Sequence, residues 1–238
     1  IALDIIDNLD HSLFEIAARI WKPIFPQGTA SAAWSPAGDR IALVVEKSNA
    51  ASLELLTVET NRLQTLLSFT GLDLALAWPE PDTLLLMDPP SRQTQSSLWS
   101  YSLRNRARRE VVADKTGLMV RWNADKGLAL SNNALSFIRT DGTAAQQLSF
   151  ATMPSKCAWN ATQMICAIPR DLGSRALPDD YLKQKNASAD DLYEVSRETG
   201  TLGRRIMETP YDMEELTLRG NALYFIDRYS GKLYVFDL

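Results

Sequence analysis

The chain has 238 residues, of which 45% are apolar and 23% are charged, and its net charge is −4 with an isoelectric point near 5.2. This balance excludes a disordered or fibrous chain and argues against a general nucleic-acid binder, which presents a basic surface. No apolar run approaches the roughly 20 residues that cross a bilayer, and no secretory signal sequence is present within the chain.

The first residues form two short apolar stretches separated by polar ones. We predict strands at residues 2–6 and 13–16 with a turn at residues 8–11, because Asn and Asp favour turns. His11, the single histidine, falls in this turn. No Gly-x-Ser-x-Gly or His-x-x-x-His pattern accompanies it, so a Ser-His-Asp triad or a histidine metal site lacks its other members. We therefore interpret His11 as a solvated turn residue and predict no catalytic, cofactor-binding or metal-binding residue.

Residues 32–45 predict a strand, a tight turn and a second strand. Pro36 presets φ for a turn, and Gly38 permits a positive φ. Weaker copies of this stretch recur, each marked near the end of its first strand by Trp34, Trp78, Trp122, Trp159 or, in the last copy, Leu218. One hairpin cannot bury its own apolar face, so the repetition is what allows a fold. We interpret these Trp residues as packing between neighbouring sheets.

A second landmark is a Leu that opens the third strand of each copy. These residues are Leu13, Leu53, Leu98, Leu135, Leu192 and Leu233. Repeats of about 40 to 45 residues with four short strands each are typical of propeller blades. The sequence therefore predicts an all-β chain, a β-propeller of four-stranded blades with about six blade-equivalents, although five or seven also fit.

The two landmarks also predict the blade boundaries within a single domain. The blades span residues 1–28 (partial), 29–70, 71–114, 115–151, 152–209 and 210–238 (partial). Three strands in each partial blade and four in each full blade give 22 strands. Because the chain begins at Ile1 rather than Met, we expect an upstream segment to have been removed. Strands in that segment would make this chain the C-terminal part of a longer propeller.

The pattern Trp-Ser-Pro-x-Gly-x-x-Ile-Ala at residues 34–42 resembles the TolB-like propeller repeat, a WD-like blade of periplasmic and cell-surface proteins. The resemblance covers most of the chain and is strongest at residues 34–45. In the copies at residues 78–82, 122–127 and 159–162, the Ser-Pro-x-Gly turn has decayed.

Three later segments, residues 156–169, 176–181 and 190–193, look like uncharacterised, membrane-anchored bacterial propellers of this type. This resemblance implies an extracytoplasmic location, in the periplasm or at the cell surface, behind an N-terminal anchor absent from this chain. It implies no enzymatic activity, because such proteins serve as binding platforms or are unassigned.

Cys157 and Cys166 are the only cysteines, and they flank one predicted turn. With a four-residue loop at residues 160–163, they lie opposite each other on one face of a hairpin and a disulfide can close. With a three-residue loop and a bulge, the register shifts by one residue and the thiols stay apart. The disulfide would imply an oxidising compartment, whereas free thiols would favour an intracellular protein.

Two polar segments are candidate partner-binding surfaces. They comprise Arg104, Arg106, Arg108 and Arg109 with Trp99, and Asp179, Asp180, Tyr181, Lys183 and Lys185. The arginines suit an anionic polymer or a lipid headgroup, the alternative being a solvated hairpin. The second group lies in the longest insertion, residues 172–189, between two strands of one blade. We interpret the acidic pairs Asp179–Asp180 and Asp190–Asp191 as helix-capping or solvated residues, since their spacing matches no calcium loop.

Together these features predict a non-enzymatic binding or scaffold module outside the cytoplasm. We expect it to recognise a protein or a cell-envelope polymer, without nucleic acid, cofactor or direct membrane contact. The alternatives are a propeller that is accessory to a hydrolase or lyase or is itself one, and an intracellular WD-repeat-like scaffold. The strand starts at residues 30–31, 74–75, 118–119 and 154–155 carry no His, Asp, Glu or Arg, which disfavours catalysis in a central channel.

Overall fold

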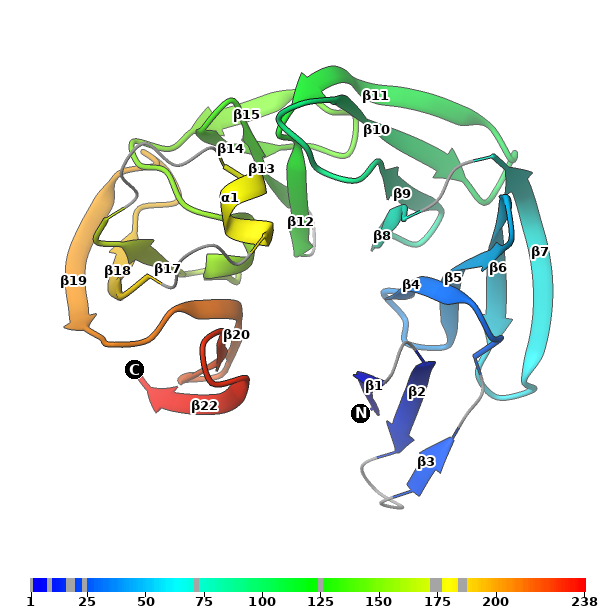
Figure 1. Ribbon diagram of the computed structural model, residues 1–238, viewed down its shortest axis with the longest axis horizontal. Helices are drawn as coiled ribbons and strands as arrows, with labels where there is room; N and C mark the ends of the chain where they lie inside the picture. The colour runs from blue at the N-terminus through cyan, green and yellow to red at the C-terminus, as the bar shows by residue number, and fades with distance from the viewer. Residues whose placement is uncertain are drawn as a thin grey trace. The chain divides into compact units, whose positions relative to one another are not determined.

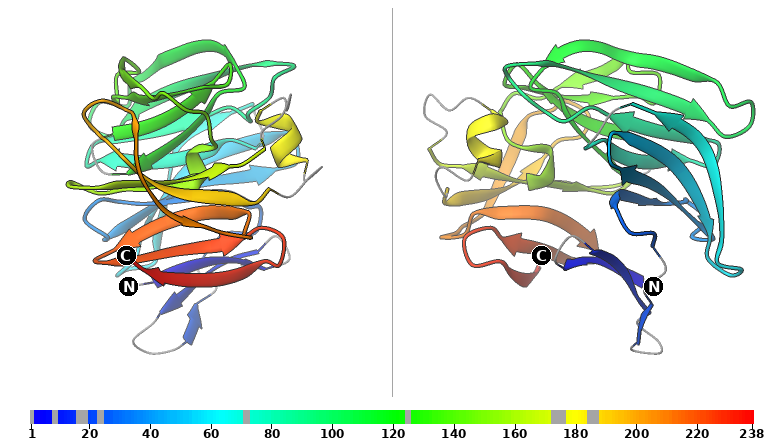
Figure 2. Two further views of the ribbon diagram at one scale, coloured as in Figure 1. Left: turned by 90° about the vertical axis from the view of Figure 1, so that its left-hand side faces the viewer. Right: turned by 45° about the vertical axis from the view of Figure 1, so that its right-hand side comes forward.

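The described part of the chain folds almost entirely into strands. The computed structural model describes the backbone of residues 2–7, 10–15 and 20–22 and all atoms of residues 25–70, 73–123, 126–171, 177–183 and 188–238. These ranges form 22 strands in six antiparallel sheets, with one 3-10 turn and one short α-helix (Figures 1 and 2). No helix within them is long and apolar enough to cross a membrane.

The chain divides into two compact units, each with most of its contacts inside itself. The first comprises Ile1–Pro89 and Trp99–Arg109, and the second comprises Pro90–Leu98 and Glu110–Leu238. The strand count and its distribution, three strands in the first and last sheets and four in the others, match the prediction from the repeat. The organisation as a single domain stays a prediction.

The first sheet has the order β1-β2-β3, with β1 (Ala2–Asp7), β2 (Asp10–Glu15) and β3 (Ile20–Lys22). The prediction that His11 belongs to a turn is wrong, because it lies within β2 opposite Ile6. The pairing of the two strands continues to Asp7 and Asp10, so the ladder extends past the expected strand ends. The side chain of His11 lies outside the described atoms.

The second sheet, β4-β5-β6-β7, contains the hairpin that defines the repeat. Its strands are β4 (Thr29–Trp34), β5 (Arg40–Lys47), β6 (Ala50–Thr57) and β7 (Arg62–Phe69). In the turn, Ser35 Oγ accepts hydrogen bonds from the backbone N–H groups of Asp39 (3.2 Å) and Arg40 (3.0 Å) and donates to Asp39 Oδ1 (2.8 Å). This last bond holds the pKa of Asp39 below its usual value. Gly38 has a φ of 73°, as its place in the turn predicted.

The third and fourth sheets repeat the same antiparallel meander. The third is formed by β8 (Ala75–Glu80), β9 (Thr83–Met87), β10 (Gln95–Ser102) and β11 (Arg108–Thr116). The fourth is formed by β12 (Met119–Asn123), β13 (Lys126–Ser131), β14 (Ala134–Ile138) and β15 (Ala144–Gln147). In β12, Trp122 lies opposite Gly127, where an added Cβ would lie 2.8 Å from the indole. A glycine is therefore required across from this Trp.

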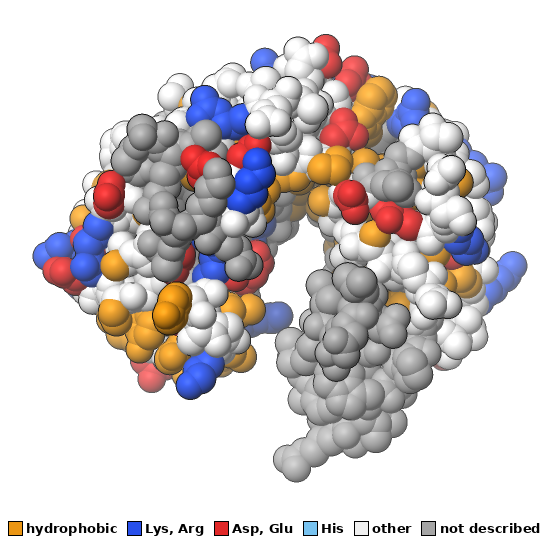
Figure 3. Space-filling model, in the orientation of Figure 1, with side chains coloured by type: hydrophobic (Ala, Val, Ile, Leu, Met, Phe, Trp, Pro, Cys, Tyr) orange, Lys and Arg blue, Asp and Glu red, His pale blue; other side chains and the backbone are white. Residues whose placement is uncertain are grey.

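The fifth sheet carries the insertion, and the sixth ends the chain. The 3-10 turn η1 (Pro154–Lys156) leads into β16 (Cys157–Trp159), β17 (Met164–Pro169), β18 (Asp190–Val195) and β19 (Leu202–Glu208), with α1 (Asp179–Leu182) between β17 and β18. The last sheet consists of β20 (Met213–Arg219), β21 (Ala222–Asp227) and β22 (Lys232–Asp237). Figure 3 shows hydrophobic side chains gathered over this last sheet, in which Leu233 and Val235 of β22 are exposed.

Three of the five residues at the repeated Trp position, Trp78, Trp159 and Leu218, pack between sheets. In the first unit, Trp78 is 6% exposed and shares a core with residues of the second sheet, including Val44 and Leu53. In the second unit, Trp159 is 2% exposed and meets Phe137 of the fourth sheet edge to face, with ring centroids 6.0 Å apart. Leu218 packs in the same way against apolar residues of the fifth sheet. For these positions the predicted role of the repeat in joining sheets is confirmed.

We expect Trp78→Ala to lower the free energy of unfolding by about 3–5 kcal/mol, because it leaves a cavity between two sheets. Trp99→Ala is the matched control, since Trp99 belongs to the same unit but is only half-buried, with the Arg108 guanidinium 4.7 Å above its ring. Its effect should be less than half as large in urea denaturation followed by circular dichroism. Equal losses for the two variants would contradict the role given to Trp78.

Candidate functional site

A cavity of about 510 Å³ lies in the second unit, where the first strands of three successive sheets end. Its walls come from β12, β16 and β20 and from the turns after β16 and β18. The lining residues are Arg121, Trp122, Asn123, Cys157, Ala158, Trp159, Asn160, Ala161, Arg197, Leu216, Thr217, Leu218 and Arg219. The volume falls in the range of ordinary small-ligand pockets, about 300–1,000 Å³.

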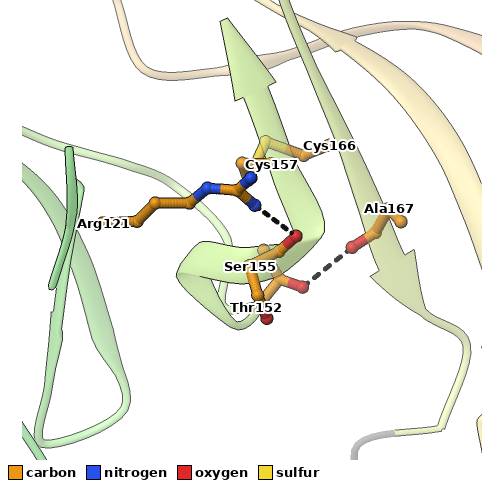
Figure 4. The surroundings of a disulfide bond; sticks show 6 residues. All are labelled: Arg121, Thr152, Ser155, Cys157, Cys166 and Ala167. Atoms are coloured by element: carbon orange, nitrogen blue, oxygen red, sulfur yellow. Dashed lines mark hydrogen bonds between the residues drawn. A yellow bond between two sulfur atoms is a disulfide. The ribbon is translucent and has the colours of Figure 1, made fainter. Parts of the chain in front are cut away.

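The cavity is electropositive, although the chain as a whole is acidic. Among the residues that the structure describes, three arginines line it and no Asp or Glu does. Arg121 donates to the carbonyl oxygen of Ser155 at 2.9 Å (Figure 4). Its guanidinium also lies 3.4 Å from the carboxylate of Glu215. Burial lowers the pKa of Arg121 and Glu215 opposes this, yet an arginine keeps its charge at any physiological pH. Three positive charges therefore line the cavity, and Glu215 is the one carboxylate of the described residues that forms an ion pair with them.

Apolar and aromatic side chains form the rest of the wall. Trp122, Trp159, Leu216 and Leu218 all line the cavity. Among the described residues, four buried side-chain nitrogens lack a hydrogen-bond partner, and three of them belong to lining residues: Trp122 Nε1, Trp159 Nε1 and Arg197 Nε. Buried donors are normally paired, so the unmet hydrogen bonding around this cavity is on the donor side.

The disulfide stands beside the cavity. Cys157 on β16 lies directly opposite Cys166 on β17, and their sulfur atoms are bonded (Figure 4). The loop between the strands is the four-residue one, closed by hydrogen bonds from the N–H groups of Thr162 (2.9 Å) and Gln163 (3.0 Å) to Asn160 Oδ1. Of the two registers that the sequence left open, the structure has the one that brings the sulfurs together.

A buried ionic cluster anchors the insertion next to these strands. Lys156 is completely buried, and its Nζ lies 2.5 Å from both Asp190 Oδ2 and Asp212 Oδ1. Ser188 Oγ donates to Asp190 (2.8 Å) and to Asp212 (3.1 Å). Burial raises the pKa of Asp190, and the charge of Lys156 opposes this rise. With no solvent contact, these groups have a structural role.

The ring of Tyr181 from α1 covers this cluster. Arg228 lies 3.9 Å and Lys156 Nζ 5.3 Å from its centre. Its hydroxyl donates to Glu214 at 3.3 Å, and burial raises its pKa. Tyr181 therefore fastens the insertion to the last two sheets and presents almost no surface to a partner.

The interpretation of Asp190 and Asp191 as capping or solvated residues is wrong. Asp190 is part of the buried cluster, and Asp191 pairs with Arg170 (2.7 Å) and Arg205 (3.2 Å). The hydrogen bond from Arg170 holds the pKa of Asp191 below its usual value. Both belong to β18, and their basic partners come from η1 (Lys156), from the residue after β17 (Arg170) and from β19 (Arg205).

The remaining candidate residues are not among those that line the cavity. Asp179 accepts a hydrogen bond from the backbone N–H of Arg92 (2.7 Å) and lies 3.8 Å from Lys183, which is exposed. Asp180 is half-buried, and Lys185 lies outside the described residues. In the first unit, Arg104, Arg106, Arg108 and Arg109 are all exposed around the hairpin of β10 and β11.

Comparisons with known proteins bear on the fold. No family model matches the sequence, and no curated protein matches it significantly. The acylaminoacyl peptidase of Pyrococcus horikoshii matches with a TM-score of 0.65 and 12% identity, over 95% of this chain and 40% of that one. The β-propeller domain of the trilobed protease from Pyrococcus furiosus matches with a TM-score of 0.62 and 12% identity, over 99% of this chain and 76% of that one. TolB from Acinetobacter baumannii matches with a TM-score of 0.57 and 14% identity, over 96% of this chain and 59% of that one.

The chain has a β-propeller fold. The TolB-like propeller expected from the Trp-Ser-Pro repeat is thereby supported at the level of the fold. At these identities the comparisons show the fold alone, and this propeller chain spans only part of the peptidase and of TolB.

Sequence reasoning missed the arginines of the cavity and the buried Lys156. A signal for two of the arginines was present, because Arg121 and Arg219 are neighbours of Trp122 and Leu218, which hold the repeated Trp position. Residues beside that position lie at the ends of the first strands, where the cavity forms. Nothing in the sequence pattern marks Lys156, since its partners lie 34 and 56 residues away.

We expect Lys156→Met to lower the free energy of unfolding by about 3–5 kcal/mol, because two buried carboxylates lose their cation. Lys183→Met, at an exposed lysine of the same insertion, should change it by less than about 1 kcal/mol. Thermal or urea denaturation measures both. A loss below about 1 kcal/mol for Lys156→Met would contradict the role given to this cluster.

Proposed function

We propose that this propeller is a non-enzymatic binding module that recognises a protein or a cell-envelope polymer through the cavity of its second unit. The observation that carries the proposal is a cavity of ligand size whose described lining has three arginines and apolar walls and contains no acidic residue. Such a surface binds and orients an anionic group, but it offers no nucleophile with an adjacent base. A single histidine in the chain also disfavours the common acid–base constellations.

We further propose that the protein acts outside the cytoplasm, in the periplasm or at the cell surface, behind an N-terminal membrane anchor. The Cys157–Cys166 disulfide supports this location, because disulfides persist in oxidising compartments. The resemblance of the repeat to TolB-like propellers supports it as well.

The proposed location outside the cytoplasm predicts that Cys157 and Cys166 are oxidised in the native protein. Protein expressed with its native upstream sequence should fractionate with the cell envelope. Mass spectrometry without reduction should find Cys157 and Cys166 in one disulfide-linked peptide pair. Recovery in the cytosol with both thiols alkylated by iodoacetamide would favour the intracellular scaffold instead.

Two other surfaces are proposed as secondary contacts. One is the exposed arginine cluster formed by Arg104, Arg106, Arg108 and Arg109, in which Arg108 stacks on Trp99. The other is the exposed part of the insertion around Lys183. The arginine cluster belongs to the first unit, and Lys183 belongs to the same unit as the cavity.

A propeller attached to a hydrolase is the second candidate function. The observation in its favour is that this chain matches 40% of a peptidase of similar fold. The full-length reading frame decides between the two, since a neighbouring hydrolase domain would support the accessory role and its absence would remove it.

The binding role is tested by affinity capture from envelope extracts with four variants. Arg219→Glu reverses a charge at the cavity, and Arg139→Glu reverses an exposed charge of the same unit away from it. Arg109→Glu and Lys183→Glu report on the secondary surfaces. We expect a partner that Arg219→Glu loses and Arg139→Glu retains. A partner that is insensitive to Arg219, or no partner at all, would overturn the role of the cavity.

A further inference from the structure

We infer that the cavity binds a carboxylate carried on an apolar group, as at the free C-terminal end of a peptide chain. The inference rests on the proposed binding function and names the class of ligand for the same site. It is carried by three independent properties of the lining: its charge, its hydrogen-bonding balance and its apolar walls.

The positive charge of the lining favours an anion, and the shape of the guanidinium groups favours a planar one. Arg219 is exposed and has no ion-pair or hydrogen-bond partner among the described residues, so its guanidinium is available to a ligand. Arg121 and Arg197 bring two further positive charges to the same cavity. A guanidinium presents parallel N–H groups that match the two oxygens of a carboxylate.

The hydrogen-bonding groups of the lining favour a ligand that accepts hydrogen bonds. The backbone carbonyls of Asn160 and Ala161 already accept from Arg197, and that of Trp159 accepts from Asn123. The unpaired groups are the donors on Trp122, Trp159 and Arg197. An ammonium group, which can only donate, would find these three carbonyls already accepting a hydrogen bond.

The apolar walls separate an amphiphilic carboxylate from a bare inorganic anion. Two indoles and the side chains of Leu216 and Leu218 line the cavity beside the arginines. A phosphate or sulfate ion would leave this surface without a partner. An apolar side chain next to the carboxylate would instead be buried against it, and aromatic groups are strong contributors to such contacts.

The experiment uses acetylated tetrapeptides, Ala-Ala-Ala-Xaa, in which Xaa is each of the twenty residues and the C-terminus is either a free acid or an amide. Binding to the whole chain is measured by isothermal titration calorimetry. Free acids with apolar Xaa should bind, and their amides should bind at least tenfold more weakly, because the charge-assisted bonds are lost. Arg219→Gln should weaken the acid at least fivefold, and Arg139→Gln should not.

A second measurement reports where the peptide binds. The indole N–H signals of Trp122 and Trp159 should shift in ¹H–¹⁵N spectra, because both indoles line the cavity that the peptide would fill. The indole N–H of Trp78 already donates to the carbonyl of Pro81 and is an internal control. Shifts confined to Trp78 would overturn the assignment of the site.

Further arms distinguish the sources of the anion. An amidated peptide with an internal Asp or Glu that binds as tightly as the free acid supports the carboxylate but places it on a side chain. Inorganic phosphate that competes as strongly as the peptide acids would overturn the inference. So would equal affinity for acid and amide, or no binding by any free acid.

The two proposals fail in different ways. If a partner captured from the envelope depends on Arg219 while no peptide acid binds, the cavity is a binding site for another ligand and only the carboxylate inference is lost. If peptide acids bind and no such partner is captured, the ligand class holds and the proposal of a macromolecular partner bound through the cavity is lost.

Discussion

The packing of apolar side chains between successive small sheets is the interaction on which this structure depends. A sheet of three or four short strands cannot bury both faces by itself, so each needs a neighbour on either side. In this chain the residue at the end of the first strand supplies much of the contact. Trp78 and Trp159 bury large rings there, and Leu218 does the same with a smaller side chain.

The residues at the repeated Trp position also form part of the candidate site. Trp122, Trp159 and Leu218 all hold the repeated position, and all three line the cavity of the second unit. Their strands end side by side, so the residues next to them, Arg121 and Arg219, are brought together from distant parts of the sequence. A contact made for stability therefore places charges of one sign around an apolar space. The disulfide from Cys157 holds one of these strands to its neighbour.

The buried ionic cluster around Lys156 helps to hold the insertion in place. The described part of the insertion between β17 and β18 is held in two ways. Leu177 and Tyr181 pack in the apolar core, and Ser188 and Tyr181 contact the buried ionic cluster. Lys156 and Arg228 balance Asp190 and Asp212, and Tyr181 covers the cluster. Buried ion pairs add little net stability over apolar replacements, but they are specific about geometry, since each charge requires its partner.

The sequence by itself determined the class of fold, the number of strands and the turns, because these depend on local patterns. A Trp-Ser-Pro-x-Gly turn and alternating apolar residues are properties of a few neighbouring residues, and their recurrence reveals the repeat. It left the register at Cys157 open, because one residue of loop length decides between two pairings. It misplaced His11 and Asp190, because strand ends and ionic partners depend on what lies opposite. The cavity and its arginines were decided only by the tertiary structure, since three strands separated by long intervening segments must pack before their ends can meet.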